Sequence, residues 1–120
     1  MKIALTTSGD DLNAPLDSRF GRTPRFIVVD SENLNYTLVE NEQNLNSAQG
    51  AGIQSALTIT NAGASVVITG HCGPKAFKVL QTAGIKIYNT NVRTVNEALT
   101  MFKEGKLIEA QNADVEGHWI

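Results

Sequence analysis

The side chains best suited to chemistry occur in a glycine-bounded segment, Gly70-His71-Cys72-Gly73-Pro74. Cys72 is the one cysteine of the chain, and His71 places an imidazole directly before it. A thiolate beside an imidazole suits copper, iron or a molybdenum–sulfur species better than magnesium or calcium. Cys72 and His71 are therefore candidate metal ligands. The alternative is that Cys72 is a small, half-buried apolar side chain, which is common for a lone cysteine.

A second segment carries three of the four arginines, Arg19-Phe20-Gly21-Arg22-Thr23-Pro24-Arg25. A guanidinium group presents a fixed fork of donors that suits oxyanions, phosphate or a thioanion. Phe20 can supply an apolar wall beside these donors. The alternative is a solvated loop whose arginines pair with Asp17 and Asp30. This alternative competes more strongly for the second and third arginines than for Arg19.

The predicted fold also suggests where ligands would bind. In an open α/β sheet, ligands bind beyond the carboxyl ends of the parallel strands, where the next helix offers unpaired N–H groups and the positive end of its dipole. Residues 70–74 lie between an apolar strand and a helix, and Gly50-Ala51-Gly52 stands at the head of another helix. Glycine lets the backbone approach a bound group closely. Both places are predicted to cradle an anion.

The apolar periodicity predicts elements in the order β, loop, ββ, α, β, α, β, α. The predicted strands are residues 1–6, 25–30, 35–41, 65–69 and 85–88. The first predicted helix lies between Gly52 and Asn61, and the second runs from Pro74 to a stop at Ala83-Gly84. The third predicted helix runs from Val95 to Phe102 and ends at Gly105. Residues 25–30 and 35–41 form an antiparallel hairpin, and the strand–helix–strand units require parallel strands. We therefore expect an α/β fold whose mixed sheet has about five strands and one antiparallel member. Loop asparagines, Asn41 among them, are interpreted as turn residues.

Composition excludes several classes of protein. A chain of 120 residues makes one domain, and its net charge of −2 gives no cationic field for nucleic acid. One cysteine excludes an internal disulfide, a C-x-x-C redox pair, a Cys₄ zinc site and an all-cysteine iron–sulfur cluster. The apolar runs are too short to cross a bilayer, and residues 1–5 are too short for a signal peptide. We expect a cytoplasmic protein that binds neither membrane nor nucleic acid.

Catalytic constellations are scarce. The sequence contains no nucleophile elbow, P-loop, H-E-x-x-H motif or dinucleotide fingerprint. Acidic residues near the amino terminus could hold a divalent metal for phosphoryl chemistry, but acids in a polar, turn-rich loop are ordinarily solvated. A phosphoryl hydrolase would require Asp10, Asp17 and Asp30 to cluster at strand ends.

Several motifs together resemble the dinitrogenase iron-molybdenum cofactor-binding family. They are Lys2-Ile3-Ala4, Thr7-Ser8-Gly9, the run from Ala14 to Phe26, Gly50-Ala51-Gly52-Ile53-Gln54, the run from Ile68 to Phe77, and Leu80-Gln81-Thr82-Ala83-Gly84-Ile85. The resemblance covers residues 1–108, which we interpret as a cofactor-binding domain, and leaves residues 109–120 as a C-terminal tail. The tail, with Val115-Glu116-Gly117-His118-Trp119, is similar to stand-alone members such as the orange proteins.

The resemblance implies a three-layer α/β/α, ribonuclease H-like fold without nuclease chemistry. It implies a non-enzymatic carrier for an anionic molybdenum-containing metal–sulfide cluster, either an iron-molybdenum cofactor precursor or a molybdenum-copper sulfide cluster, held non-covalently. The implied partners are the cluster and a cofactor-assembly protein. The alternative is a regulatory module that docks a partner protein such as an ATPase. Carried onto this sequence, the cofactor-binding residues are Arg19, Phe20, Gly21, Gly50, Gly52, Ile53, His71, Cys72 and Gly73.

Overall fold

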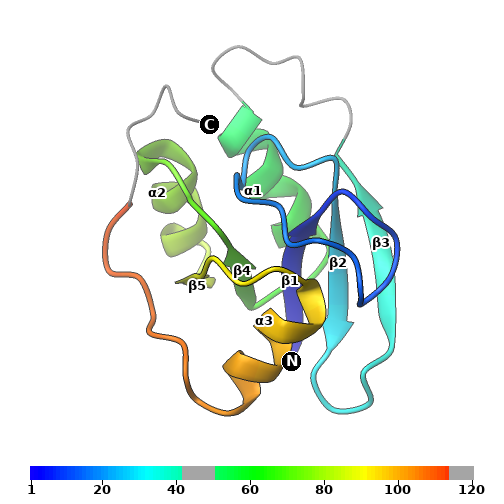
Figure 1. The fold of residues 1–120 in the computed structure, drawn as a ribbon. Helices are drawn as coiled ribbons and strands as arrows, with labels where there is room; N and C mark the ends of the chain where they lie inside the picture. Colours follow the sequence, from blue (N-terminus) through cyan, green and yellow to red (C-terminus); the bar gives the residue numbers. More distant parts are fainter. Residues whose placement is uncertain (42–50, 114–120) are drawn as a thin grey trace.

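The computed structural model describes residues 1–41 and 51–113 (Figure 1). The strands of this part are β1 (Lys2–Thr7), β2 (Arg25–Asp30), β3 (Tyr36–Glu40), β4 (Val66–Thr69) and β5 (Lys86–Asn89). Its helices are α1 (Ala51–Asn61), α2 (Pro74–Thr82) and α3 (Val95–Lys103). The predicted order of elements is confirmed, and most predicted ends agree to within one or two residues.

The strands form one mixed sheet in the order β3-β2-β1-β4-β5. β2 pairs antiparallel with β1 on one side and with β3 on the other, while β1, β4 and β5 pair in parallel. β2 is therefore the one strand that runs against the rest. The predicted five-stranded sheet with one antiparallel member is confirmed.

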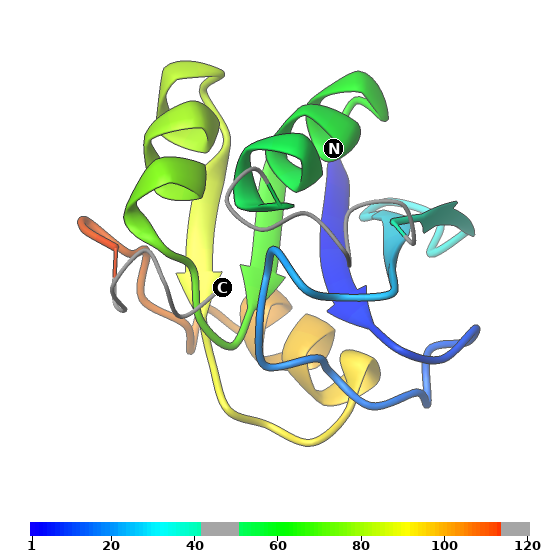
Figure 2. The same ribbon diagram turned by 90° about the horizontal axis from the view of Figure 1, so that it is seen from above.

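Helices cover the two faces of the sheet unequally, and Figure 2 shows α1 and α2 on one side and α3 on the other. Because side chains alternate along a strand, each strand supplies both layers of core. In β1, for example, Ala4 packs toward α1 and α2, whereas Ile3 and Leu5 pack toward α3. The α/β fold with three layers is confirmed.

Local chemistry accounts for the helix ends. Pro74 occupies the first turn of α2, where its missing N–H costs nothing, and Gly84 follows the helix with φ +79°. The Thr94 side chain caps α3 by accepting a hydrogen bond from the Glu97 N–H. One expectation needs correction, because Ala51 and Gly52 belong to the first turn of α1 rather than to a loop before it.

The predicted tail begins as part of the sheet. Glu109 forms an antiparallel bridge with Tyr88 of β5, and the Ala110 N–H donates to the Ile87 carbonyl at 2.7 Å. Ala110 and Ala113 pack against the core on the α1 and α2 side. The division at residue 108 stays a prediction, and His118 and Trp119 lie outside the described residues. No helix in residues 1–41 and 51–113 has the length and apolar character needed to span a membrane.

Candidate functional site

Three segments far apart in the sequence meet at the carboxyl ends of β1 and β4. Arg19, in the loop after β1, forms an isolated parallel bridge with His71, in the loop after β4. The Phe20 N–H donates to the His71 carbonyl at 3.0 Å. Gly21 lies against the backbone of Gly52 in the first turn of α1. The arginine segment therefore lies between the two glycine-containing segments that the sequence singled out.

Glycine permits this convergence through backbone packing. A Cβ at Gly70 would lie 2.6 Å from the Cα and the carbonyl oxygen of Ser18. A Cβ at Gly21 would lie 3.0 Å from the N and Cα of Gly52. The distance at Gly70 is shorter than real Cβ contacts, so this position requires glycine, whereas a side chain at Gly21 would require the backbone of Gly52 to shift by a few tenths of an ångström. In the described residues, the backbone of Gly52 is packed against another loop, while Gly50 lies outside the described part.

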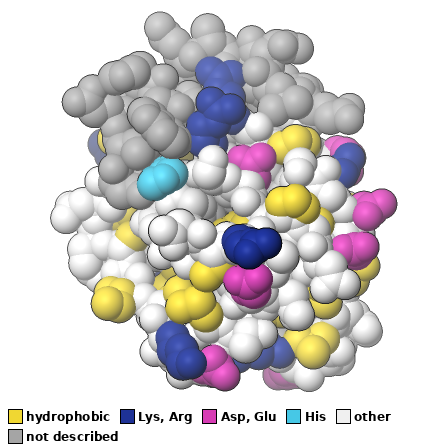
Figure 3. Space-filling view, viewed as in Figure 1, with side chains coloured by type: hydrophobic (Ala, Val, Ile, Leu, Met, Phe, Trp, Pro, Cys, Tyr) yellow, Lys and Arg dark blue, Asp and Glu magenta, His cyan; other side chains and the backbone are white. Residues whose placement is uncertain are grey.

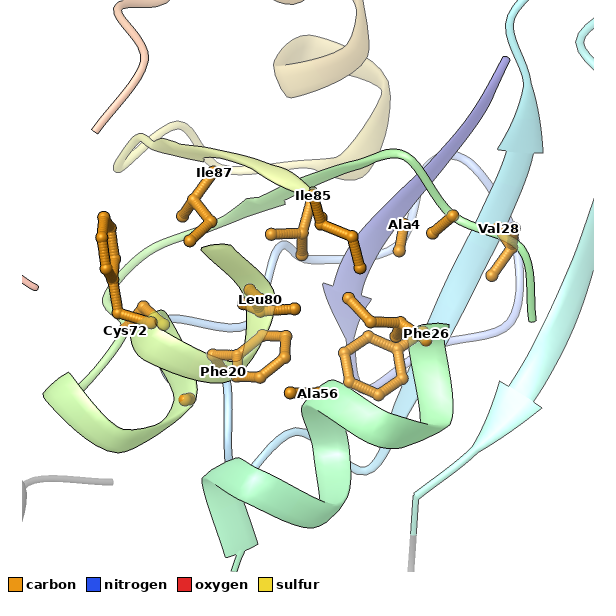
Figure 4. Packing of buried hydrophobic residues seen from close by; sticks show 14 residues of the cluster. Ala4, Phe20, Phe26, Val28, Ala56, Cys72, Leu80, Ile85 and Ile87 are labelled. Carbon is orange, nitrogen blue, oxygen red and sulfur yellow. The ribbon is translucent and has the colours of Figure 1, made fainter. Parts of the chain in front are cut away.

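The paired loops present two different sides. Arg19 and His71 are bridge partners, so their side chains leave on one side, and their neighbours Phe20 and Cys72 leave on the other. Arg19 is exposed and His71 is partly exposed. Phe20 is 0% exposed and Cys72 is 1% exposed, both within the core that also holds Leu80 (Figure 4).

This division corrects the role expected of Phe20. Its ring forms core against Phe26, with ring centroids 5.6 Å apart, instead of an open wall for a ligand. The Cys72 Sγ lies 3.7 Å from the Gly73 carbonyl oxygen and is covered by the surrounding core. The predicted ligand role of Cys72 stays a prediction, and it would require the sulfur to become accessible.

Positive charge and helix polarity meet at the same edge. Gly73 is the buried N-cap of α2 and offers no capping side chain, and the positive end of the helix dipole lies at this edge. Lys75 is exposed in the first turn of this helix. Ile53, in the first turn of α1, is partly exposed. Figure 3 shows the molecule from the side that carries α3, with a group of Lys and Arg side chains near the top of the view and a histidine nearby.

Arg25 has a structural role. Its guanidinium pairs with Glu40 of β3 at 2.8 Å and also donates to the carbonyls of Ser8 and Gly9. Arg25 therefore forms its ion pair with Glu40, whereas Asp17 and Asp30 were the partners expected from the sequence. The Asp17 carboxylate instead accepts the backbone N–H of Arg19 at 2.9 Å.

A buried polar network holds the arginine segment, and sequence reasoning missed it. Asn41 is 0% exposed, and its Nδ2 donates to the Thr23 carbonyl at 3.0 Å and to the Ser55 hydroxyl at 2.9 Å. The Ser55 hydroxyl donates in turn toward the Gly21 carbonyl at 3.5 Å. Asn41, interpreted as a turn residue, instead joins β3, α1 and the arginine loop. No local pattern distinguishes such an asparagine from its neighbours.

The carboxylates do not gather. Asp17 bonds through its N–H to Thr6 near the carboxyl end of β1, whereas Asp30 is paired in register with Lys2 at the other end. Within the described ranges, no group of three or more His, Cys, Asp and Glu side chains could hold a metal ion. The phosphoryl-hydrolase alternative required Asp10, Asp17 and Asp30 together, so we drop it.

Comparison with known proteins places this arrangement in a family. Residues 1–105 match the profile described as dinitrogenase iron-molybdenum cofactor. The chain belongs to this family. An uncharacterized protein of Methanocaldococcus jannaschii is 37% identical over 110 residues, which cover 89% of each chain. The resemblance inferred from the motifs is thereby confirmed.

Solved structures agree with this placement. The apo form of the orange protein from Desulfovibrio gigas has a TM-score of 0.93 and 37% identity, with 95% of this chain and 96% of that chain covered. A putative NifB protein from Thermotoga has a TM-score of 0.84 and 34% identity, with 97% and 98% covered. The chain is thus similar to stand-alone members of the family over nearly its whole length.

Within this family member, the quoted motifs converge in space. The arginine segment, the start of α1 and residues 70–74 are separated by tens of residues in the sequence and touch at one edge of the sheet. We define this edge, with Arg19, His71 and the first turn of α2 as its exposed part, as the arginine–histidine edge.

Proposed function

We propose that this chain is a non-enzymatic carrier of an anionic, molybdenum-containing metal–sulfide cluster, held without covalent attachment. The cargo is an iron-molybdenum cofactor precursor or a molybdenum-copper sulfide cluster. The observation that carries the proposal is the meeting of Arg19 and His71 beside the N-terminus of α2, in a chain of the dinitrogenase iron-molybdenum cofactor family. The partners of such a carrier are the protein that assembles the cluster and the protein that receives it.

The arginine–histidine edge suits an anion. The Arg19 guanidinium is a permanent cation and donates fork-like hydrogen bonds, and Lys75 adds a second exposed charge. The uncapped N–H groups in the first turn of α2 favour negative charge through the helix dipole. Pro74 and Ile53 add apolar surface at the same two helix starts.

Weak, shared contacts suit a carrier. The chain has one cysteine, and its sulfur is buried, so covalent ligation through several thiolates is impossible. Coulomb attraction, N–H donors and apolar contact each contribute modestly, and their sum can be lost and regained as cargo passes between proteins. A carrier needs this reversibility more than it needs high affinity.

Reconstitution tests the proposal directly. Tetrathiomolybdate and copper are added to the apoprotein, the mixture is desalted, and the absorption spectrum and metal content of the protein fraction are measured. We expect a chromophore that remains with the protein at a fixed metal-to-protein ratio. The same reagents desalted with heat-unfolded chain provide the control. A protein fraction without chromophore, or one no richer in metal than the control, would contradict the proposal.

A further inference from the structure

A small pocket opens where the chain changes from one face of the sheet to the other. β4 leads into α2 on one face, and its neighbour β5 leads into α3 on the opposite face. Open α/β sheets bind ligands in the crevice outside the carboxyl ends of such a strand pair. A cavity of about 130 Å³ lies at this place, lined by Leu16, Ser18, Gly70, His71, Thr90, Asn91 and Val92.

Hydrogen bonds brace the three loops that form the pocket walls. The Asn89 side chain donates to the Gly70 carbonyl at 3.2 Å, which ties the loop after β4 to the end of β5. The Leu16 N–H donates to the Arg93 carbonyl at 3.0 Å, which ties the loop after β1 to the loop after β5. The close approach of Gly70 to Ser18 completes the ring. The pocket is therefore formed before any ligand arrives, and binding costs little loop ordering.

The lining selects by charge and by size. Ser18, Thr90 and Asn91 can donate hydrogen bonds, and none of the described residues that line the pocket is a carboxylate. The cavity is several times larger than the roughly 10–15 Å³ that one water-sized probe fills, which leaves room for one central atom with four oxygen or sulfur ligands. A cation would lack a charged oxygen partner here. The Ser18, Thr90 and Asn91 side chains accept as well as donate hydrogen bonds, so protonated and fully deprotonated tetrahedral oxyanions both fit.

We propose that this pocket binds one small tetrahedral oxyanion of the sulfate, phosphate and molybdate class. The pocket shares His71 with the arginine–histidine edge but extends toward the loop after β5, whose Thr90 and Asn91 belong to neither cluster-binding segment. His71 lines the pocket and is paired with Arg19, so the two sites are adjacent. Binding here does not depend on the carrier function, because an oxyanion can be added without sulfide or copper.

Nuclear magnetic resonance titration tests the site on the full chain. Sodium molybdate is added at constant ionic strength, the backbone amide shifts are followed, and sodium chloride provides the control. We expect saturable shifts concentrated at residues 16–18, 70–71 and 90–92, and similar shifts with sulfate, tungstate and phosphate. Shifts that grow linearly without saturation, or that match those caused by chloride, would overturn the proposal.

Two variants locate the binding. Thr90→Val removes one donor at nearly constant volume and should weaken molybdate binding by roughly tenfold, and Asn91→Leu should do the same. Thr100→Val makes the matched change at an exposed position of α3, away from the pocket, and should bind as the wild type does. Equal affinity of all three variants and the wild type would refute the site. Reconstitution with thiomolybdate and copper, measured separately, distinguishes failure of this pocket from failure of the carrier proposal.

Discussion

At the scale of single residues, adjacency in the sequence does not mean adjacency in function. His71 and Cys72 are neighbours, as are Arg19 and Phe20, yet the extended backbone sends the members of each pair to opposite sides. Phe20 and Cys72 complete the core, and Arg19 and His71 face outward. The sequence singled out two loops that the structure brings together, but it could not assign the sides, because the bridge between them joins residues 52 positions apart (71 minus 19).

Arg19→Ala should weaken cluster retention severalfold while leaving the thermal midpoint nearly unchanged, because an exposed arginine contributes little to stability. Retention after desalting and the midpoint of thermal unfolding are measured on the same preparation. Arg93→Ala is the matched control, since Arg93 is also exposed and lies outside the arginine segment. Equal retention by Arg19→Ala and wild type would remove Arg19 from the site.

The Cys72→Ala substitution distinguishes the two roles considered for Cys72, a metal ligand or a core side chain. Because the thiol is buried among apolar side chains, we expect the variant to lose roughly 1 kcal/mol of stability and to retain the cluster. Unfolding by denaturant and cluster retention after desalting provide the two readouts. A large loss of cluster affinity with normal stability would show instead that the sulfur is a ligand, as the sequence predicted.

At the scale of elements, the sequence predicted type and order well because apolar periodicity and glycine or proline boundaries agree. β2 shows this, since its apolar run is buried on both faces and its predicted ends match the observed ones. Contacts between elements were harder to foresee. Ala51 and Gly52 lie in the first turn of α1, where Gly21 packs against them, and the buried Asn41 side chain bonds groups on two other segments. Such contacts are long-range and leave no local signature.

Asn41→Ala should lower the free energy of unfolding by about 2 to 3 kcal/mol, because it removes two buried hydrogen bonds and leaves the Thr23 carbonyl without its donor. Denaturant unfolding measures the change. Asn35→Ala, at an exposed position of the β2–β3 turn, should change stability by less than about 0.5 kcal/mol. Similar effects of the two substitutions would contradict the role assigned to the network.

The contribution of the β2–β3 turn to the stability of the protein should decrease slightly at acid pH. The Glu32 N–H donates to the Asp30 carboxylate at 2.8 Å, and this hydrogen bond lowers the pKa of Asp30 from its usual 3.8. A lowered pKa in the folded state stabilises the protein above pH 3.8, and that contribution is lost as the pH falls through the folded pKa.

Asp30→Asn tests this prediction. The difference in thermal midpoint between wild type and variant should be constant near neutral pH and shrink as the pH falls below 3.8. Glu32→Gln, at an exposed position of the same turn, serves as the control. A difference that stays constant through the acid range would show that the carboxylate does not contribute in its ionised form.

At the scale of the whole molecule, the fold brings three loops together at one edge of the sheet. The loops after β1, β4 and β5 meet there, and the helices that follow β4 and β5 diverge to opposite faces. Element order alone predicted that ligands would bind at this edge. The pocket between β4 and β5 was not foreseen, because Thr90 and Asn91 belong to a loop that the sequence presents only as a turn.

The most direct test of the central claim is a metal and sulfide analysis of the protein purified without oxygen from its native source. We expect molybdenum, together with copper or iron and inorganic sulfide, in a fixed ratio to polypeptide and released intact when the chain is unfolded. Protein that carries no molybdenum, from cells grown with molybdenum, would contradict the claim that this chain carries a molybdenum-containing cluster.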